Sequence, residues 1–80
     1  MEKVIRMDGN KNKVYFPGSI VSIEHITNDR HGIIYTEIIF SNGSSLKVSD
    51  QIDAILYNLN NQEGDLILEE YEYKVNGFVV

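Results

Sequence analysis

The chain has 80 residues, with 7 Lys and Arg against 12 Asp and Glu, and its net charge at neutral pH is −5. A chain of this length is expected to form one domain, residues 1–80, and to bury only about 60% of the surface that it exposes when unfolded. The negative charge disfavours non-specific nucleic-acid binding, which depends on Lys and Arg contacts to phosphates. The absence of Cys excludes a disulfide framework and a thiolate metal site.

The first ten residues contain no apolar stretch of the kind found in secretion signals, and the chain has no run of about 18 apolar residues. We therefore expect a small, soluble, cytoplasmic protein without a membrane partner. The charge is uneven along the chain, because residues 1–30 sum to +1 and residues 31–80 sum to −6. The acidity thus belongs to the second part of the sequence.

Short β-rich segments separated by Gly and Asn dominate the chain. Residues 3–7 are predicted to form a strand that ends at a turn over residues 8–10. Residues 14–16 follow as a second strand, and Pro17 ends it because proline lacks the backbone N–H that a sheet needs. We expect the two strands to pair as a hairpin.

Residues 20–27 and 33–41 are the longest β-rich runs of the first half, and the polar residues between them suit a hairpin loop. In the first run we expect a buried face formed by Val21, Ile23 and His25. In the second run both faces are largely apolar, so we predict a central strand that is covered on each side.

Asn42-Gly43 is the strongest short hairpin signal in the chain, because both residues accept the positive φ of a type I′ turn. Residues 44–48 are therefore expected to return antiparallel to the central strand.

One amphipathic helix is predicted near residues 50–60, with Ser49 or Asp50 as its N-cap. A helix with a single apolar stripe must lay that stripe on a sheet or on a partner. The stripe has the spacing i, i+3, i+4 and i+7 and consists of Ile52, Ile55, Leu56 and Leu59.

Residues 66–75 are predicted to form a last long strand. Asn76 and Gly77 then offer a second tight turn, and residues 78–80 are expected to return as a strand or to dock as an apolar tail. Three apolar residues in a row also leave a self-association contact open.

Together these elements predict a mainly β domain, either a small antiparallel barrel or a strongly bent sheet, with one α-helix near residues 50–60 packed over it. A core of this size gives only marginal stability, so a homodimer formed through an edge strand stays open. The expected core residues are Ile5, Val14, Val21, Ile23, Ile34, Ile38, Phe40, Leu46, Val48, Ile52, Ile55, Leu56, Leu59 and Ile67.

No arrangement of residues in the sequence points to catalysis or to a cofactor. The serines lie outside any G-x-S-x-G turn, and the chain has no glycine motif for binding phosphate. His25 and His31 offer imidazole ligands for zinc beside several carboxylates. Their spacing matches no helical ligand pair, so we interpret them as a strand residue and a loop residue and predict no metal site.

One basic cluster occurs near the start of the chain. It suits either a hairpin that contacts phosphates or a loop whose charges serve solubility, and the sequence leaves both readings open. The cluster consists of Lys3, Arg6, Lys11 and Lys13.

Acidic residues are concentrated in the predicted last strand, where tyrosines interleave with them. Paired carboxylates can act as acid and base on a sugar, but 80 residues leave little room for a substrate cleft. Aromatic side chains ringed by charge are typical of protein-binding surfaces. We therefore predict a partner-binding face that consists of Glu69, Glu70, Tyr71, Glu72 and Tyr73.

Three segments follow one another in an order that is found in a known family. Residues 4–9 read Val-Ile-Arg-Met-Asp-Gly, residues 20–29 begin Ile-Val-Ser-Ile-Glu, and residues 38–43 read Ile-Ile-Phe-Ser-Asn-Gly before an Ile/Leu helix. Over residues 4–60 this order resembles the small FlbD family of flagellar proteins. The resemblance implies a compact β-rich domain with a helix and a flagellar type of regulatory role. The acidic residues after position 65 depart from that family's pattern.

These observations predict a non-enzymatic interaction or regulatory protein that acts by binding another protein. An alternative is a phage or mobile-element inhibitor that presents its acidic strand to a basic groove, in which case salt should weaken binding steeply. A third alternative is a small-molecule binder whose pocket is lined by Tyr15, Tyr35, Phe40 or Tyr57.

Overall fold

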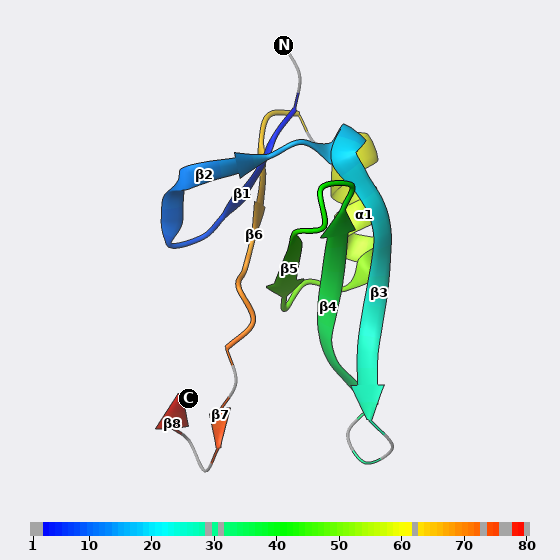
Figure 1. The fold of residues 1–80 in the computed structure, drawn as a ribbon, viewed down its shortest axis with the longest axis vertical. Helices are drawn as coiled ribbons and strands as arrows, with labels where there is room; N and C mark the ends of the chain where they lie inside the picture. The colour runs from blue at the N-terminus through cyan, green and yellow to red at the C-terminus, as the bar shows by residue number, and fades with distance from the viewer. Residues whose placement is uncertain are drawn as a thin grey trace.

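The computed structural model describes residues 3–28, 30, 32–61, 63–72, 74–75 and 78–79. Within them the fold is mainly β with one α-helix, which confirms the predicted fold class (Figure 1). The strands form two three-stranded sheets and a separate two-stranded hairpin. In the described part of the chain these sheets do not close into a barrel, so the fold is the bent, open alternative.

The first sheet has the strand order β2-β1-β6. β1 (Ile5–Met7) and β2 (Asn10–Tyr15) pair as the predicted antiparallel hairpin, although β2 begins four residues earlier than expected. β6 (Leu66–Leu68) lies on the other side of β1 and is parallel to it. This parallel pair joins segments that are about 60 residues apart in the chain and was not part of the antiparallel prediction.

The second sheet has the strand order β3-β4-β5 and is antiparallel throughout. Its strands are β3 (Ile20–Asn28), β4 (Gly32–Phe40) and β5 (Ser45–Val48), and a single 3₁₀ turn, η1 (Pro17–Ser19), leads into it from β2. β4 is central, as predicted. Figure 1 shows this sheet beside the first one, with the helix packed along it.

The hairpin between β4 and β5 uses a three-residue loop rather than the predicted type I′ turn. Gly43 N–H donates to Phe40 C=O at 3.0 Å, and Phe40 N–H donates to Ser44 C=O at 2.9 Å. Gly43 has a φ of +89°, which an L-residue rarely adopts. A turn over residues 40–43 therefore closes the loop, and Gly43, its last residue, supplies the left-handed conformation.

The helix α1 (Ile52–Asn61) begins after both of the predicted N-cap residues. The Ile52 N–H, at its first position, donates instead to His25 Nε2 of β3 at 3.1 Å. The Asp50 carboxylate accepts a hydrogen bond from the Glu69 N–H at 2.9 Å. A strand histidine thus satisfies one of the free N–H groups of the helix, and its Nε2 must be unprotonated to do so.

At the other end of α1 a lysine satisfies free carbonyl groups. Lys3 Nζ donates to Asn58 C=O at 3.1 Å and to Leu59 C=O at 3.0 Å. A cation is favourable at this position because the C-terminal end of a helix carries partial negative charge. Both ends of the helix are therefore tied to segments that are distant in the sequence.

The core lies between the two sheets and α1. Five of the predicted core residues are buried, namely Ile5, Ile38, Phe40, Val48 and Ile55. Burial of four further side chains was not predicted, namely Met7, Leu66, Leu68 and Thr36. The predicted core residues that are half-buried are Ile23, Ile34, Leu46, Ile52 and Leu59.

Four predicted core residues are exposed: Val14, Val21, Leu56 and Ile67. Val21 is 66% exposed because the register of β3 shifts at this point. Ile20 pairs with Phe40 and Ser22 pairs with Ile39, which leaves Val21 as the extra residue of a bulge.

The prediction that both faces of β4 are covered is wrong for the described residues. The face that carries Thr36 and Ile38 is buried, whereas Tyr35 and Ile39 on the other face are half-buried. Ile33, near the start of the strand, is 44% exposed. The second sheet therefore has one core face and one outer face.

The predicted strand over residues 66–75 is interrupted. β6 ends at Leu68, an isolated bridge follows at Glu70, and β7 (Lys74–Val75) begins later. β7 pairs antiparallel with β8 (Phe78–Val79), which confirms the predicted returning strand. The expected turn residues between them, and the last residue of the chain, lie outside the described residues.

Candidate functional site

Residues 69–72, which we call the acidic segment, continue from β6 and lie beside β5. An isolated antiparallel bridge pairs Glu70 with Val48. The Tyr71 N–H donates to the Lys47 C=O at 3.0 Å, which holds the segment against the outward edge of β5. The acidic segment thus connects the first sheet to the second one.

The chain passes from hydrogen bonds beside the first sheet to hydrogen bonds beside the second sheet between two consecutive residues. Leu68 C=O accepts a hydrogen bond from the Asp8 N–H at 2.8 Å, beside the first sheet. The next residue, Glu69, donates its N–H to the Asp50 carboxylate and accepts from the Ser49 N–H at 2.9 Å, beside the second sheet. Hydrogen bonds on both sides of this point position the acidic segment relative to the core.

Tyr71 is half-buried, and its ring packs against the outer face of the second sheet. The Tyr71 and Tyr35 ring centroids are 5.0 Å apart, with the ring planes inclined by 34°. The Lys47 ammonium lies 5.4 Å from the centroid of the Tyr35 ring. An offset aromatic pair and a cation over one ring are both favourable, because the face of an aromatic ring carries partial negative charge.

Glu70 and Tyr71 stand between two surface hollows, of about 320 Å³ and about 310 Å³. The first hollow separates the β1–β2 hairpin from β5 and is also lined by Met7, Asn10, Tyr15, Ser45, Leu46 and Lys47. The second hollow lies at the other side of the acidic segment and is also lined by Ile34, Ser49, Glu69 and Glu72.

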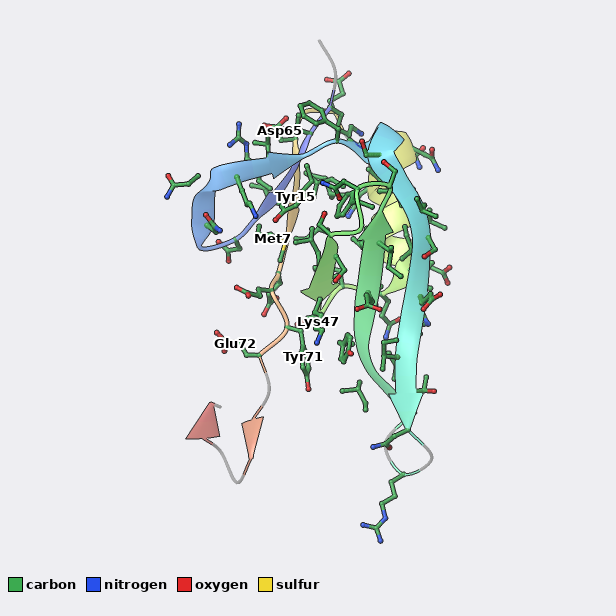
Figure 2. The ribbon with its side chains drawn as sticks, viewed as in Figure 1. Met7, Tyr15, Lys47, Asp65, Tyr71 and Glu72 are labelled. Atoms are coloured by element: carbon green, nitrogen blue, oxygen red, sulfur yellow. The ribbon has the colours of Figure 1, made fainter. Side chains whose placement is uncertain are left out.

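Four of the five predicted site residues lie in the described part of the chain. Glu69, Glu70 and Glu72 are exposed, and Tyr71 is half-buried. Figure 2 shows that Tyr71 and Glu72 point to opposite sides of the segment. Tyr73 lies outside the described residues.

The predicted partner-binding face did not include three residues that line the first hollow together with Glu70 and Tyr71. Met7 and Tyr15 come from the first sheet, and Lys47 comes from the hairpin of the second sheet. Figure 2 shows Lys47 next to Tyr71. The alternation of β5 places Lys47 on the outer face, but only the long-range pairing of residues 47–49 with residues 69–71 brings it to the site.

The structure describes only one of the two histidines. His25 uses its Nε2 to accept the first helical N–H, and His31 lies outside the described residues. In the described ranges no three His, Asp or Glu residues come close enough together to hold a metal ion.

The residues of the basic cluster are dispersed among separate interactions. Lys3 bonds to the end of α1, and Arg6 Nε pairs with Asp65 Oδ2 at 3.0 Å. The Lys13 ammonium lies 5.8 Å from the Tyr15 ring centroid, and the Lys11 side chain lies outside the description. These separate contacts favour the structural and solubility reading over a phosphate-binding hairpin.

The four aromatic residues proposed for a ligand pocket do not converge. Tyr15 and Phe40 stack with centroids 5.1 Å apart and line a third hollow of about 280 Å³. Tyr35 packs against Tyr71 instead, and Tyr57 is 67% exposed on α1. The arrangement therefore gives less support to a barrel-type ligand pocket than to a binding surface.

No known family model matches the chain, and neither a curated protein nor a solved structure is significantly similar to it. In the part of the chain that the structure describes, no helix is long and apolar enough to cross a membrane.

Proposed function

We propose that the chain is a non-enzymatic protein-binding module, and that the acidic segment with Tyr71 is its contact surface. One observation carries this proposal. Tyr71 is held half-buried between two hollows, while its neighbours in the chain, Glu70 and Glu72, are exposed. A fixed aromatic side chain with a charged rim is the arrangement that binding hot spots use.

Physical chemistry favours a macromolecular partner over a small substrate. Both hollows lie at the surface and are lined by charged as well as apolar side chains, whereas small-molecule sites enclose most of their ligand. Tyr71 is already ordered by its contact with Tyr35 and by its backbone bond to Lys47. Its side chain therefore loses little further conformational entropy when a partner contacts it.

A matched pair of tyrosine substitutions tests this proposal. The tagged chain and its Tyr71→Ala and Tyr57→Ala variants would each be used to capture proteins from a bacterial lysate. Tyr57 is a suitable control, because it is exposed on α1 and far from the acidic segment in sequence. We expect Tyr57→Ala to retain the captured protein and Tyr71→Ala to lose most of it. Equal capture by both variants would contradict the proposal.

A second candidate function is inhibition of a partner that has a basic groove, as a phage or mobile-element protein would do. The observation that favours it is the exposure of three carboxylates within four residues, Glu69, Glu70 and Glu72. Such binding should weaken steeply as salt rises, because exposed charges are screened over about 8–10 Å at physiological ionic strength. A regulatory partner, of the kind implied by the FlbD resemblance, should depend on Tyr71 more than on salt. Measuring affinity from low to high salt separates the two candidates.

A further inference from the structure

A side chain of β3 holds the start of α1. His25 is half-buried, and its Nε2 accepts a hydrogen bond from the Ile52 N–H at 3.1 Å. The Ile55 N–H donates to the Gln51 C=O at 3.0 Å, which places Ile52 in the first turn, where backbone N–H groups have no partner inside the helix. Because α1 packs along β3, this bond ties the first turn of the helix to the strand beside it (Figure 1).

The bond between His25 and Ile52 exists only while Nε2 carries no proton. A neutral imidazole has one nitrogen that accepts, whereas both nitrogens donate once the ring is protonated. Protonation would bring two donors together and would add a positive charge to the end of α1 that already carries partial positive charge. Histidine is the side chain that ordinarily changes its charge between about pH 5 and pH 8. The anchor of α1 is therefore sensitive to pH in this range.

A buried hydroxyl beside His25 offers the protonated ring a different partner. Thr36 pairs with His25 across β3 and β4, so the two side chains are neighbours on one face of the sheet. Thr36 is 1% exposed, and in the part of the chain that is described its Oγ1 has no hydrogen-bond partner. A buried polar group in this state costs free energy. An imidazolium that turns away from α1 can donate to this oxygen, which gives the ring two alternative arrangements.

The titratable groups on the elements that border His25 lie on the far face of the second sheet or at the start of α1. Those on the far face are Glu24, Tyr35 and Glu37. At the start of α1 the Asp50 carboxylate already accepts a hydrogen bond from a backbone N–H, and the Asp53 side chain is exposed. Exposed carboxylates stabilise a nearby cation only weakly, because water screens them. They therefore do not replace the bond that protonation removes.

The residues that His25 anchors lead directly to the supports of the acidic segment. Ser49 and Asp50 precede α1 and hold Glu69 through two hydrogen bonds, each of 2.9 Å. One residue separates Asp50 from Ile52, whose N–H is bound by His25. Release of the first turn of α1 therefore loosens the backbone that positions the acidic segment.

We propose that His25 is a pH-sensitive anchor that regulates the acidic segment as a binding surface. The inference deepens the function proposed above and rests on it. The neutral ring holds the first turn of α1, and Ser49 and Asp50 then hold the acidic segment beside β5. The protonated ring donates to Thr36 instead, so the first turn and the acidic segment lose their fixed positions. The released arrangement binds a proton that the anchored one cannot bind, and a fall in pH therefore favours release.

Hydrogen exchange of the labelled full chain, followed by nuclear magnetic resonance at about pH 7.5 and about pH 5.5, tests the anchor. Protection factors correct for the direct effect of pH on exchange. We expect those of the Ile52 and Glu69 amides to fall about fivefold to tenfold at the lower pH, the change expected for one lost hydrogen bond. Aspartate and glutamate ordinarily take up protons near about pH 4, so they contribute little in this range.

Substitutions of the two histidines provide matched controls. His25→Gln keeps an acceptor oxygen and takes up no proton, so the Ile52 amide should stay protected at both pH values. His25→Ala removes the acceptor and should give low protection at both. His31→Gln removes the other histidine and should respond as the wild-type chain does. If His25→Ala lowers the melting temperature strongly, the comparison of His25→Gln with the wild-type chain still decides the question.

Thr36→Val tests the alternative partner. Valine has nearly the same shape as threonine and lacks the hydroxyl, so the protonated ring loses its acceptor. We expect release of the Ile52 amide to require a lower pH in this variant than in the wild-type chain. Release at an unchanged pH would overturn the role of Thr36.

The remaining outcomes are distinguishable. Unchanged protection at Ile52 while the His25 ring takes up its proton would overturn the anchor, and a response at Ile52 without one at Glu69 would overturn its link to the acidic segment. In the capture experiment we expect the wild-type chain to lose captured protein at the lower pH and His25→Gln to retain it. Equal loss by both would overturn the regulation and leave Tyr71-dependent capture at neutral pH intact. Loss of that Tyr71 dependence would instead contradict the proposed function itself.

Discussion

Residues 66–68 and the acidic segment follow each other in the chain, yet their surroundings differ completely. Leu66 and Leu68 are each 1% exposed and belong to the parallel pair with β1. The carboxylates of the acidic segment are exposed, and its backbone pairs with β5 at one bridge only. The first region therefore stabilises the fold, whereas the second leaves its carboxylates exposed, as the proposed contact surface requires.

The neighbouring strand, more than the local sequence, decides whether an extended segment buries its side chains or exposes them. Residues 66–68 pair with β1 in the first sheet and bury alternate side chains in the core, as a strand with one core face must. The acidic segment crosses to the edge of the other sheet, where its exposed side chains do not meet the core. Four substitutions test this division between a buried strand and an exposed segment.

The largest effect is expected in the buried region. Leu68→Ala should lower the free energy of unfolding by about 3 kcal/mol, because truncation of a buried leucine removes apolar contacts and leaves a cavity. The matched control is Glu72→Ala, which should change stability by less than about 0.5 kcal/mol because its side chain is exposed. Urea denaturation measures both values. A similar loss for the two variants would show that the division between the regions is wrong.

The junction between the regions is expected to give an intermediate effect. Asp50→Ala should cost about 1.5 kcal/mol, because Asp50 holds the Glu69 N–H at the point where the strand changes its neighbour. Asp50→Asn keeps an acceptor oxygen and should cost less. Amide exchange should also become faster at Glu69 in the alanine variant. Unchanged exchange at that amide would mean that the Asp50 bond does not position the acidic segment.

Local patterns were sufficient to predict most of the secondary structure. The β3–β4 hairpin, the central position of β4 and the helix near residues 50–60 follow from alternation, turn residues and one apolar stripe. The same rules failed at Val21, because a bulge adds one residue and reverses the faces on either side of it. They also failed at Ile67, because Leu66 and Leu68 offered an equally apolar face and only the partner strand decides between them.

The candidate site could be predicted only in part, because local patterns do not indicate which distant residues lie beside it. The order of residues along the chain indicates an acidic segment that contains tyrosines, and four of the five predicted site residues are described in the structure. The contributions of Met7 and Lys47 could not be predicted, because they depend on the pairing of β1 with β6 and of β5 with residues 69–71. Such pairings join residues that are far apart in the sequence, and periodicity contains no information about them.

In the acidic segment itself, binding and stability should separate. Tyr71→Ala should lower the free energy of unfolding by about 1 kcal/mol, the contribution expected of one aromatic pair, while partner capture is lost. Tyr71→Phe keeps the ring contact with Tyr35 and should restore stability. A loss of stability as large as that of Leu68→Ala would mean that Tyr71 is a core residue, and its role in binding would then need independent evidence.

The smallest effect is expected at Ile67, which lies between two buried leucines and is itself 62% exposed. Ile67→Thr keeps a β-branched side chain, so the substitution changes apolar burial with little change in strand propensity. We expect a loss within about 0.5 kcal/mol in urea denaturation, because exposed positions away from special contacts tolerate such changes. A loss near 2 kcal/mol would show that something covers this face of β6 in solution. The outer face of the first sheet would then be a second interface, and the acidic segment would no longer be the only region of this strand available to a partner.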